Sequence, residues 1–357
     1  MRARPGPVAI MATGAATAVA SALPTPIGSL SRAICQGLSG GAAGLDLSDL
    51  SPVWRASPDP LFDDDLQLSL YVLYELHYRG FAGVDDAWEW HPQLLRLRGL
   101  LEGQFLDGLY RRVGPPAAGD GQDIDLQLRA ILDADSGPSL SRFLESRASL
   151  AQFQEFVVHR SAYQLKEADP HSWAIPRLDG RPKAALLEVQ FDEYGEADPE
   201  RMHSHLFAQT MSALSLDSRY GAYLDVLPAI TLATVNLMSL FGLHRRWRGA
   251  IVGHLAAFEM SSSLPNRRYS NGLLRLGTEA RARRFYDVHV LADAVHENIA
   301  AVDLAGGLVD QDPSLAGDVL FGARCLVSLD AAFAEHLLGC WHDGRGSLRQ
   351  PVLAGEQ

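Results

Sequence analysis

Three residues in the C-terminal third of the chain have the types and the spacing of metal ligands. His289, Asp293 and His296 form a His-x3-Asp-x2-His sequence inside a segment whose apolar residues recur at helical spacing. Positions i, i+4 and i+7 share one face of a helix, because a helix has 3.6 residues per turn. This face could bind a metal or be a solvated polar stripe. Asp287 and Glu297 already mark the expected solvent face, whereas the triple borders the buried arc.

The composition indicates a folded protein with an acidic surface. The 357 residues, of which 47% are hydrophobic, are enough to bury a sizeable core. The net charge of −12 argues against nucleic acid and anionic membranes, since both require a basic surface. No apolar run is long enough and free enough of charge to cross a bilayer. We therefore expect neither nucleic acid nor a membrane as a partner.

The cysteines do not suggest a thiolate metal site. Cys35, Cys325 and Cys340 are scattered and odd in number, and the sequence contains no Cys-x-x-Cys pair. A structural zinc site or a redox disulfide would need such a pair. This pattern is typical of a reducing compartment, and we expect a cytoplasmic protein.

The apolar periodicity predicts an all-α protein in four parts. We expect a disordered leader at 1–24, a helical N-terminal domain at 25–137, a second helical domain at 138–346 and a flexible tail at 347–357. The N-terminal domain is expected to form a homodimer, because a small helical appendage with exposed leucines commonly packs against another surface. The sequence has no glycine-rich phosphate loop and no Gly-x-Ser-x-Gly elbow, which disfavours nucleotide binding and serine hydrolysis.

A single carboxylate interrupts a long apolar segment upstream of the triple. Glu259 is the only acidic residue between Asp225 and Glu279. Burying a carboxylate is costly unless another group pairs with it. A metal cation could be this partner, and so could His254 or a nearby arginine.

A further histidine follows an expected helix start. Asp198, Pro199 and Glu200 supply the residue types of a helix N-terminus, which would place His203 toward the core and His205 away from it. The helix expected just upstream ends near Gly195. Its acidic residues are Glu188, Asp192 and Glu193, and spacing alone does not choose among them.

Taken together, these positions resemble those of a known family. The order Glu167, Glu193-x9-His203, Glu259 and His289-x3-Asp293-x2-His296 resembles the heme-oxygenase-like diiron oxidases and oxygenases, also described as iron-containing redox enzymes. The resemblance covers roughly residues 138–345. The separations look like those of members with an extra helical N-terminal domain, such as the streptozotocin-pathway N-oxygenase. The implied fold is a heme-oxygenase-like helical bundle preceded by a smaller helical domain.

The resemblance implies that these seven residues bind two iron ions. One iron would take His203 and His296, the other His289 and Asp293, and one or more glutamates would bridge them; the resemblance does not say which. Four carboxylates and three neutral imidazoles would balance two divalent cations, which suits a buried site. Oxygen and imidazole ligands also suit iron or manganese.

The family's chemistry implies an enzyme that uses O2 as a co-substrate. Two reduced irons would activate O2 through a peroxo-bridged diferric species and oxidise a small organic substrate, with electrons from an external donor. We favour an amine or an amino-acid-like substrate in specialised metabolism, undergoing N-oxygenation or oxidative cleavage. Candidate substrate contacts are Arg160, Tyr163, Arg201, Arg267 and Tyr269.

Three alternatives remain at the level of sequence. An iron-storing protein would use the same ligands without an organic pocket. A cofactor-free enzyme on the same fold would be favoured if Glu259 or Asp293 were exposed. A purely structural interaction module would leave the seven positions without an explanation.

Overall fold

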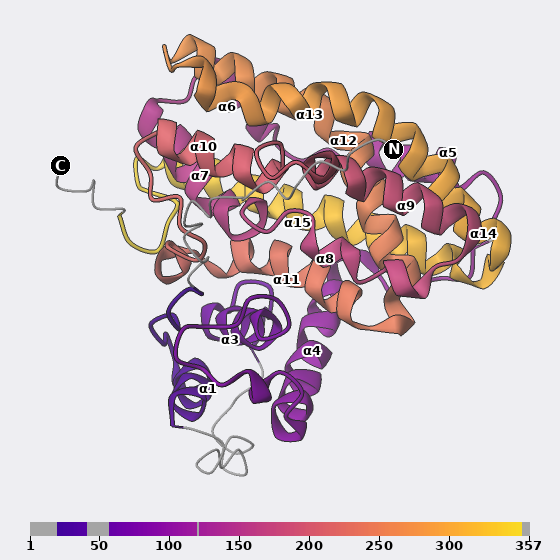
Figure 1. Ribbon diagram of the computed structural model, residues 1–357, viewed down its shortest axis with the longest axis horizontal. Coiled ribbons are helices and arrows are strands. Elements are labelled where there is room, and N and C mark those ends of the chain that lie inside the picture. The colour runs from indigo at the N-terminus through magenta and orange to yellow at the C-terminus, as the bar shows by residue number, and fades with distance from the viewer. Residues whose placement is uncertain (1–19, 41–56, 120, 352–357) are drawn as a thin grey trace, which may run out of the picture.

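The computed structural model describes residues 20–40, 57–119 and 121–351 (Figure 1). Helices make up its regular structure, and no strand occurs in these ranges, which confirms the predicted all-α class. Most of the predicted leader and the end of the predicted tail lie outside the described residues. Within them, no helix is both long enough and apolar enough to span a membrane.

Three N-terminal helices form one end of the molecule, drawn in indigo and violet in Figure 1. They are α1 (Ser29–Ser39), α3 (Asp64–Glu75) and α4 (Pro92–Val113). The Asp63 side chain caps α3 by accepting a hydrogen bond from the Leu66 backbone N–H. Helix α3 packs against α11 (Ala229–Leu243), so the N-terminal helices share a continuous core with the following bundle.

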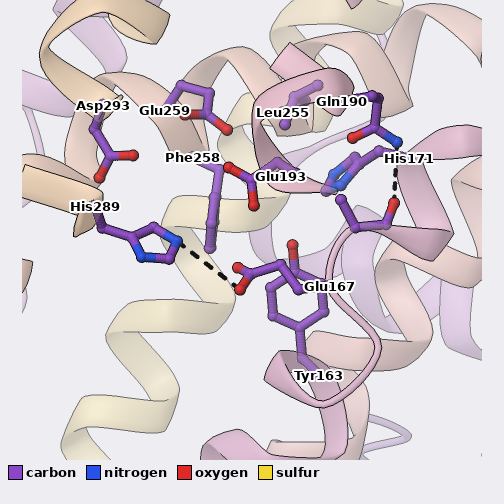
Figure 2. Close-up of a pocket in the computed structure, with 11 residues that line it drawn as sticks. Tyr163, Glu167, His171, Gln190, Glu193, Leu255, Phe258, Glu259, His289 and Asp293 are labelled. Carbon is purple, nitrogen blue, oxygen red and sulfur yellow. Dashed lines mark hydrogen bonds and ion pairs between the residues drawn. The ribbon is translucent and has the colours of Figure 1, made fainter. Parts of the chain in front are cut away.

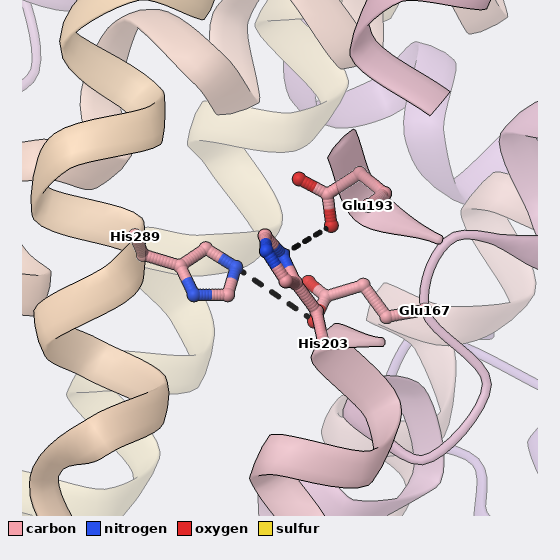
Figure 3. A group of neighbouring side chains, drawn as sticks. All are labelled: Glu167, Glu193, His203 and His289. Atoms are coloured by element: carbon pink, nitrogen blue, oxygen red, sulfur yellow. Dashed lines mark hydrogen bonds and ion pairs between the residues drawn. The ribbon is translucent and has the colours of Figure 1, made fainter. Parts of the chain in front are cut away.

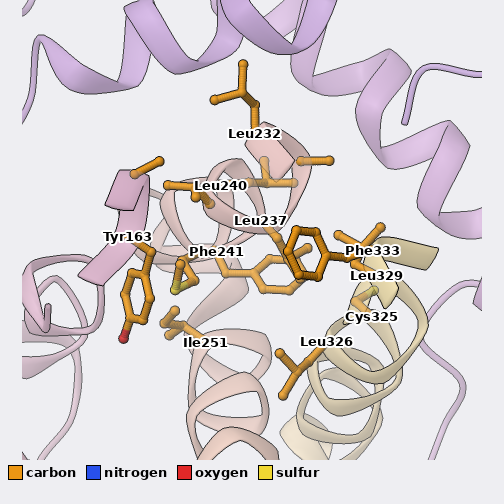
Figure 4. Packing of buried hydrophobic residues seen from close by; sticks show 14 of the residues in the cluster. Tyr163, Leu232, Leu237, Leu240, Phe241, Ile251, Cys325, Leu326, Leu329 and Phe333 are labelled. Atoms are coloured by element: carbon orange, nitrogen blue, oxygen red, sulfur yellow. The ribbon is translucent and has the colours of Figure 1, made fainter. Parts of the chain in front are cut away.

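The larger part of the molecule is a bundle of long helices. Besides α11, its main members are α7 (Leu150–Gln164), α9 (Gly180–Glu193), α10 (His203–Ala213), α12 (Arg248–Arg275), α13 (Ala280–Asn298) and α15 (Ala316–His342). Helix α12 lies at the centre and packs against both α13 and α15. Leucine and aromatic side chains of α11 and α15 fill the space between α11 and α15 (Figure 4).

Glycines allow an unusually close approach of α12 and α15. A Cβ atom at Gly253 would overlap the carbonyl oxygen of Val319, and one at Gly322 would overlap that of Ala250. The two backbones therefore touch directly, with no room for larger side chains. This contact fixes the position of α12, the helix that carries Glu259.

Shorter elements complete the bundle. The α-helices among them are α5 (Ile124–Asp133), α6 (Leu140–Ser146), α8 (Asp169–Ser172) and α14 (Gly307–Gln311). The 3-10 helices are Asp86–Trp88, Ile175–Arg177, Gly195–Ala197, Leu224–Val226, Arg245–Trp247 and Pro313–Leu315. Helix α13 continues directly into a π-helix at Ile299–Gly306, a conformation that is uncommon and often found next to functional sites.

Contacts in the structure cross three of the predicted domain boundaries. Ser21, assigned to the disordered leader, accepts a hydrogen bond from the Ala82 backbone N–H at 2.8 Å. Helix α5, assigned to the N-terminal domain, packs against α12, α15 and the π-helix of the bundle. Ser347, assigned to the flexible tail, is buried and donates a hydrogen bond from its hydroxyl to Glu155. Tertiary contacts, which local periodicity does not report, order these three segments.

Candidate metal centre

All seven predicted ligands lie in the interior. Glu193 ends α9, His203 begins α10, Glu259 lies on α12, and His289, Asp293 and His296 follow one another along α13. Glu167 lies in the turn between α7 and α8. None of the seven exposes more than 5% of its surface. The triple on α13 is therefore not a solvated stripe.

Four of these side chains converge in a first group, drawn in Figure 3. Glu167, Glu193, His203 and His289 each offer a ligand atom within 4.8 Å of the others. His203 Nδ1 and Glu193 Oε2 are hydrogen-bonded at 2.8 Å, and His289 Nε2 lies 3.8 Å from Glu167 Oε2. Two ligand atoms that each lie roughly 2.1 Å from the same metal ion would be separated from each other by distances similar to these two.

A second group adjoins the first. Glu193, Glu259 and His296 also offer ligand atoms within 4.8 Å of one another, with His296 Nδ1 lying 3.4 Å from Glu259 Oε2. Glu193 belongs to both groups. Asp293 lies beside them, and its Oδ2 accepts hydrogen bonds from Ser262 Oγ at 2.7 Å and from Asn266 Nδ2 at 3.2 Å.

This grouping differs from the pairing that the resemblance implied. The expected partners were His203 with His296, and His289 with Asp293. Instead the rings of His203 and His289 face each other at 4.3 Å between centroids, and His296 is grouped with Glu259. The difference arises because the start of α10 packs against the middle of α13, which places His203 opposite the first histidine of the triple rather than the last.

Three buried polar atoms in these groups have no hydrogen-bond partner. They are Glu167 Oε2, His289 Nε2 and His296 Nδ1. Buried polar atoms are normally satisfied, so such a concentration requires an explanation. A metal cation in each group would satisfy these atoms, since carboxylate oxygen and imidazole nitrogen are ligands suited to iron. The donor set therefore fits a buried metal centre.

Hydrogen bonds orient the histidines of α13 for this role. His289 Nδ1 is 2.8 Å from the Phe285 carbonyl oxygen, which can only accept, so Nδ1 must carry the proton. In the neutral ring this leaves the lone pair on Nε2, the atom directed at Glu167. His296 Nε2 is in turn 2.9 Å from Asp192 Oδ2, which leaves Nδ1 to face Glu259.

The carboxylates crowded into the site have pKa values that differ from their usual values. Burial, followed by the charges of Glu193 and Glu259, raises the pKa of Glu167 well above its usual value. Burial and the charge of Glu259 raise the pKa of Asp293 to about 7. Burial alone would also raise the pKa of Glu193, but the adjacent His203 outweighs it and lowers the value to about 2. Carboxylates packed this closely repel one another, and a cation would relieve the repulsion.

Two cavities are each lined by more than one of the seven residues, and a surface groove of about 290 Å³ reaches only His203 among them. The first encloses about 10 Å³, the space of a water molecule, and is lined by Tyr163, His171 and five of the predicted ligands (Figure 2). The second, of about 100 Å³, is bordered by Glu167 and His289. It is lined further by Phe156, Arg160, Gln164, Phe207, Phe258, Ser261, Ser262, Pro265, Asn266, Tyr269, Tyr286 and Asp330. We call it the aromatic pocket.

The predicted substrate contacts fall into two sets. Tyr163 is buried at the first cavity, and Arg160 and Tyr269 line the aromatic pocket. Arg201 and Arg267 are exposed instead. Arg201 forms an ion pair with Glu196 beside a surface groove, and Arg267 lies on the solvent side of α12, away from the aromatic pocket. Positions close in sequence to a ligand therefore point in different directions.

Sequence reasoning did not identify several neighbours of the site. Asp192 contacts His296, and spacing alone does not distinguish it from Glu188 and Glu193. His254 pairs with His171 at 3.2 Å rather than with Glu259. The buried His171 shows no signal in the sequence, because it lies on the short helix α8 with no apolar periodicity around it.

The start of α10 was also predicted too early. The helix begins at His203 rather than at Asp198. The Asp198 side chain accepts a hydrogen bond from the Glu200 backbone N–H and so stabilises a turn before the helix. The prediction that His203 faces the core and His205 does not is confirmed.

Comparison with known proteins agrees with this donor set. Residues 154–331 match the model of a family described as iron-containing redox enzyme. The matched segment includes all seven predicted ligands. No curated protein matches the chain.

Proposed function

We propose that the protein is a non-heme diiron oxygenase or oxidase that oxidises a small organic substrate with O2, and the match of residues 154–331 to the family of iron-containing redox enzymes supports this proposal. The observation that carries this proposal is the convergence of unpartnered buried ligand atoms. Glu167 Oε2, His289 Nε2 and His296 Nδ1 lie without hydrogen-bond partners in two groups that share Glu193.

In this proposal each group holds one iron. Glu167, His203 and His289 would bind the first ion, and Glu259 and His296 the second. Glu193 belongs to both groups and would be shared by the two ions. Asp293, beside the groups, would complete the seven. Two ferrous ions held by these residues would supply the electrons and the activation of O2, and an external donor would restore the reduced state.

The protein's own contribution is orientation and the exclusion of water. The Phe285 carbonyl and Asp192 hold the rings of His289 and His296. The seven ligands are buried, and the apolar side chains of Leu255 and Phe258 line the first cavity. A dry and rigid environment strengthens electrostatic interactions with the metal ions and with the reacting groups.

The aromatic pocket is the proposed substrate site. Apart from the proposed metal ligands Glu167 and His289, its charged groups are Arg160 and Asp330, whose Nη2 and Oδ1 atoms are 3.6 Å apart. The Tyr286 hydroxyl at its wall is buried without a hydrogen-bond partner. A cation, an anion and an unpaired hydroxyl would suit a small molecule that carries both an amine and a carboxylate. We therefore propose an amine or amino-acid-like substrate, with N-oxygenation or oxidative cleavage in specialised metabolism as the reaction.

The same features argue against the alternatives. An iron-storing protein has no need of an organic pocket next to its ligands, and the aromatic pocket is bordered by Glu167 and His289. A cofactor-free enzyme has no need of buried Glu259 and Asp293, which expose 5% and 1% of their surfaces. Both observations favour a metal-dependent enzyme.

Substrate-dependent oxygen consumption tests the proposal. The iron-loaded protein, given a reductant, should consume O2 faster with one or more members of a panel of amines and amino acids. Arg160→Met should raise KM for a carboxylate-bearing substrate without changing the iron content, because Arg160 lies in the pocket but outside the ligand groups. Arg267→Met, an exposed arginine on α12, is the matched control. Iron binding without substrate-dependent oxygen consumption would instead support storage.

A further inference from the structure

Glu167 is held in a different way from the other six predicted ligands. Those six lie on helices, where hydrogen bonds of the helix hold the backbone that carries each side chain. Glu167 lies in the turn formed by residues 165–168, between α7 and α8. The placement of its carboxylate therefore depends on whatever holds this turn.

The neighbouring side chain, Lys166, extends toward the N-terminal helices. Its Nζ atom is 3.0 Å from Glu75 Oε2 at the end of α3, and neither side chain exposes more than 1% of its surface. Glu75 Oε2 also accepts a hydrogen bond from the Tyr220 hydroxyl at 2.6 Å. The Lys166 ammonium lies 4.9 Å and 4.3 Å from the ring centroids of Tyr71 and Tyr78. Lys166 is thus enclosed on several sides, with Glu75 as its anionic partner.

Two further contacts hold the backbone of the same turn. Arg79, just beyond α3, donates a hydrogen bond from Nη2 to the Leu165 carbonyl oxygen at 3.1 Å. On the other side, Gln190 of α9 donates from Nε2 to the Ala168 carbonyl oxygen at 3.1 Å. The N-terminal residues Glu75 and Arg79 therefore hold the turn from one side, and the bundle holds it from the other.

We propose that Glu75 is a positioning residue for the metal centre: by pairing with Lys166, it fixes the turn that presents Glu167 to its metal ion. This inference rests on the proposed diiron function. A buried ion pair tolerates little change in geometry, because each charge has lost its hydration and depends on the other. The pair consequently restrains the backbone next to Glu167, and the N-terminal helices help to assemble a site that lies in the bundle.

The test is metal binding by a variant that removes both charges, Glu75→Gln/Lys166→Met. Replacing both partners avoids leaving one buried charge without the other. Anaerobic equilibrium titration with Co²⁺, followed by its visible absorption, should show two ions in the wild-type protein. In the variant, one ion should bind about 10- to 100-fold more weakly, the usual effect of losing an interaction that orients a ligand. The other ion should bind as before, because Glu259 and His296 lie on helices.

A matched control separates positioning from general stability. Arg98 and Glu102 form another ion pair of the N-terminal region, with 10% and 4% of their side-chain surfaces exposed and 3.1 Å between Nε and Oε1. Neither residue contacts the turn at 165–168. Arg98→Met/Glu102→Gln should reduce thermal stability without changing the affinity for either ion. An equal loss of metal affinity in this control would overturn the positioning role.

Two further variants keep the inference falsifiable. If the double variant fails to fold, Tyr220→Phe removes a single hydroxyl, which is bonded to Glu75 and to Tyr71, and should weaken the binding of the same ion to a smaller degree. In a Glu167→Gln background, the double variant should cause no further loss, because the two changes act through one ligand. If the double variant folds and binds both ions with wild-type affinity, this result would overturn the positioning role alone. A wild-type protein that binds no metal ion would overturn the proposed function as well.

Discussion

Asp192 on α9 holds His296 on α13 through a contact of 2.9 Å between Oδ2 and Nε2, and the opposite ring nitrogen of His296 faces Glu259 at 3.4 Å. The side chain of Asp192 is 43% exposed, whereas that of His296 is fully buried. A carboxylate that accepts the second N–H of a histidine ligand fixes the orientation of the ring and increases its basicity. Asp192 therefore orients the proposed ligand from the surface of the site.

Removing this charge should weaken the second metal ion. Asp192→Asn should lower the affinity of the ion held by Glu259 and His296 about 10- to 100-fold, with the other ion unaffected. Anaerobic titration with Fe²⁺ or Co²⁺ measures both affinities. Glu188→Gln, which changes an exposed carboxylate on the same helix, is the matched control. Equal affinities in all three proteins would show that Asp192 has no such role.

The pKa of Asp293 predicts how the stability of the metal-free protein depends on pH. Burial, followed by the charge of Glu259, raises this pKa from 3.8 to about 7. The folded state therefore binds the proton more tightly than the unfolded state. The contribution of Asp293 is most favourable below its unfolded pKa and is lost as the pH rises through about 7.

Comparison with Asp293→Asn isolates this contribution, because the variant cannot titrate at this position. Between about pH 5 and about pH 8, the free energy of unfolding of the metal-free wild-type protein should fall relative to that of the variant. The expected fall is about 1.4 kcal/mol for each unit of the Asp293 pKa shift that lies within this pH range. Urea unfolding of both metal-free proteins at the two pH values measures the difference. A difference that stays constant with pH would contradict the raised pKa.

Metal binding should stabilise the fold most at the higher pH. A ligand present at a hundred times its Kd adds about 2.7 kcal/mol to the free energy of unfolding. Protons compete with the metal for the raised carboxylates Glu167 and Asp293, so the rise in Tm on anaerobic addition of Fe²⁺ should be larger at about pH 8 than at about pH 5. A chelator should reverse the rise.

Glu193→Gln is the variant that tests this stabilisation, because Glu193 belongs to both ligand groups. It should lose most of the metal-dependent rise in Tm. Glu188→Gln on the same helix should keep it. A rise of wild-type size in Glu193→Gln would mean that the metal binds elsewhere.

Helical periodicity predicted the part of the site that lies on one element. His289, Asp293 and His296 share a face of α13, and a spacing of four and three residues is sufficient to predict this. Glu259 was singled out as the one carboxylate of a long apolar segment, and the structure buries it next to His296. In both cases the relevant information is local, so the sequence contains it.

Relationships between distant segments could not be predicted in this way. Glu75 and Lys166 are 91 residues apart, and no local pattern indicates that they form a buried pair. Asp192 and Glu193 are adjacent and of the same type, but successive residues on a helix point in different directions, so one faces His296 from the surface and the other enters the core. The grouping of His203 with His289 likewise depends on the packing of α10 against α13.

The central claim is that the two ligand groups form one dinuclear centre that reacts with O2. The most direct measurement is anaerobic loading with ferrous iron, quantification of the bound metal, and stopped-flow mixing with O2, with Glu259→Gln measured in parallel. We predict about two irons per chain and a transient visible absorption band in the wild-type protein, with fewer irons and no band in the variant. The absence of iron uptake and of any transient band in the wild-type protein would contradict the claim.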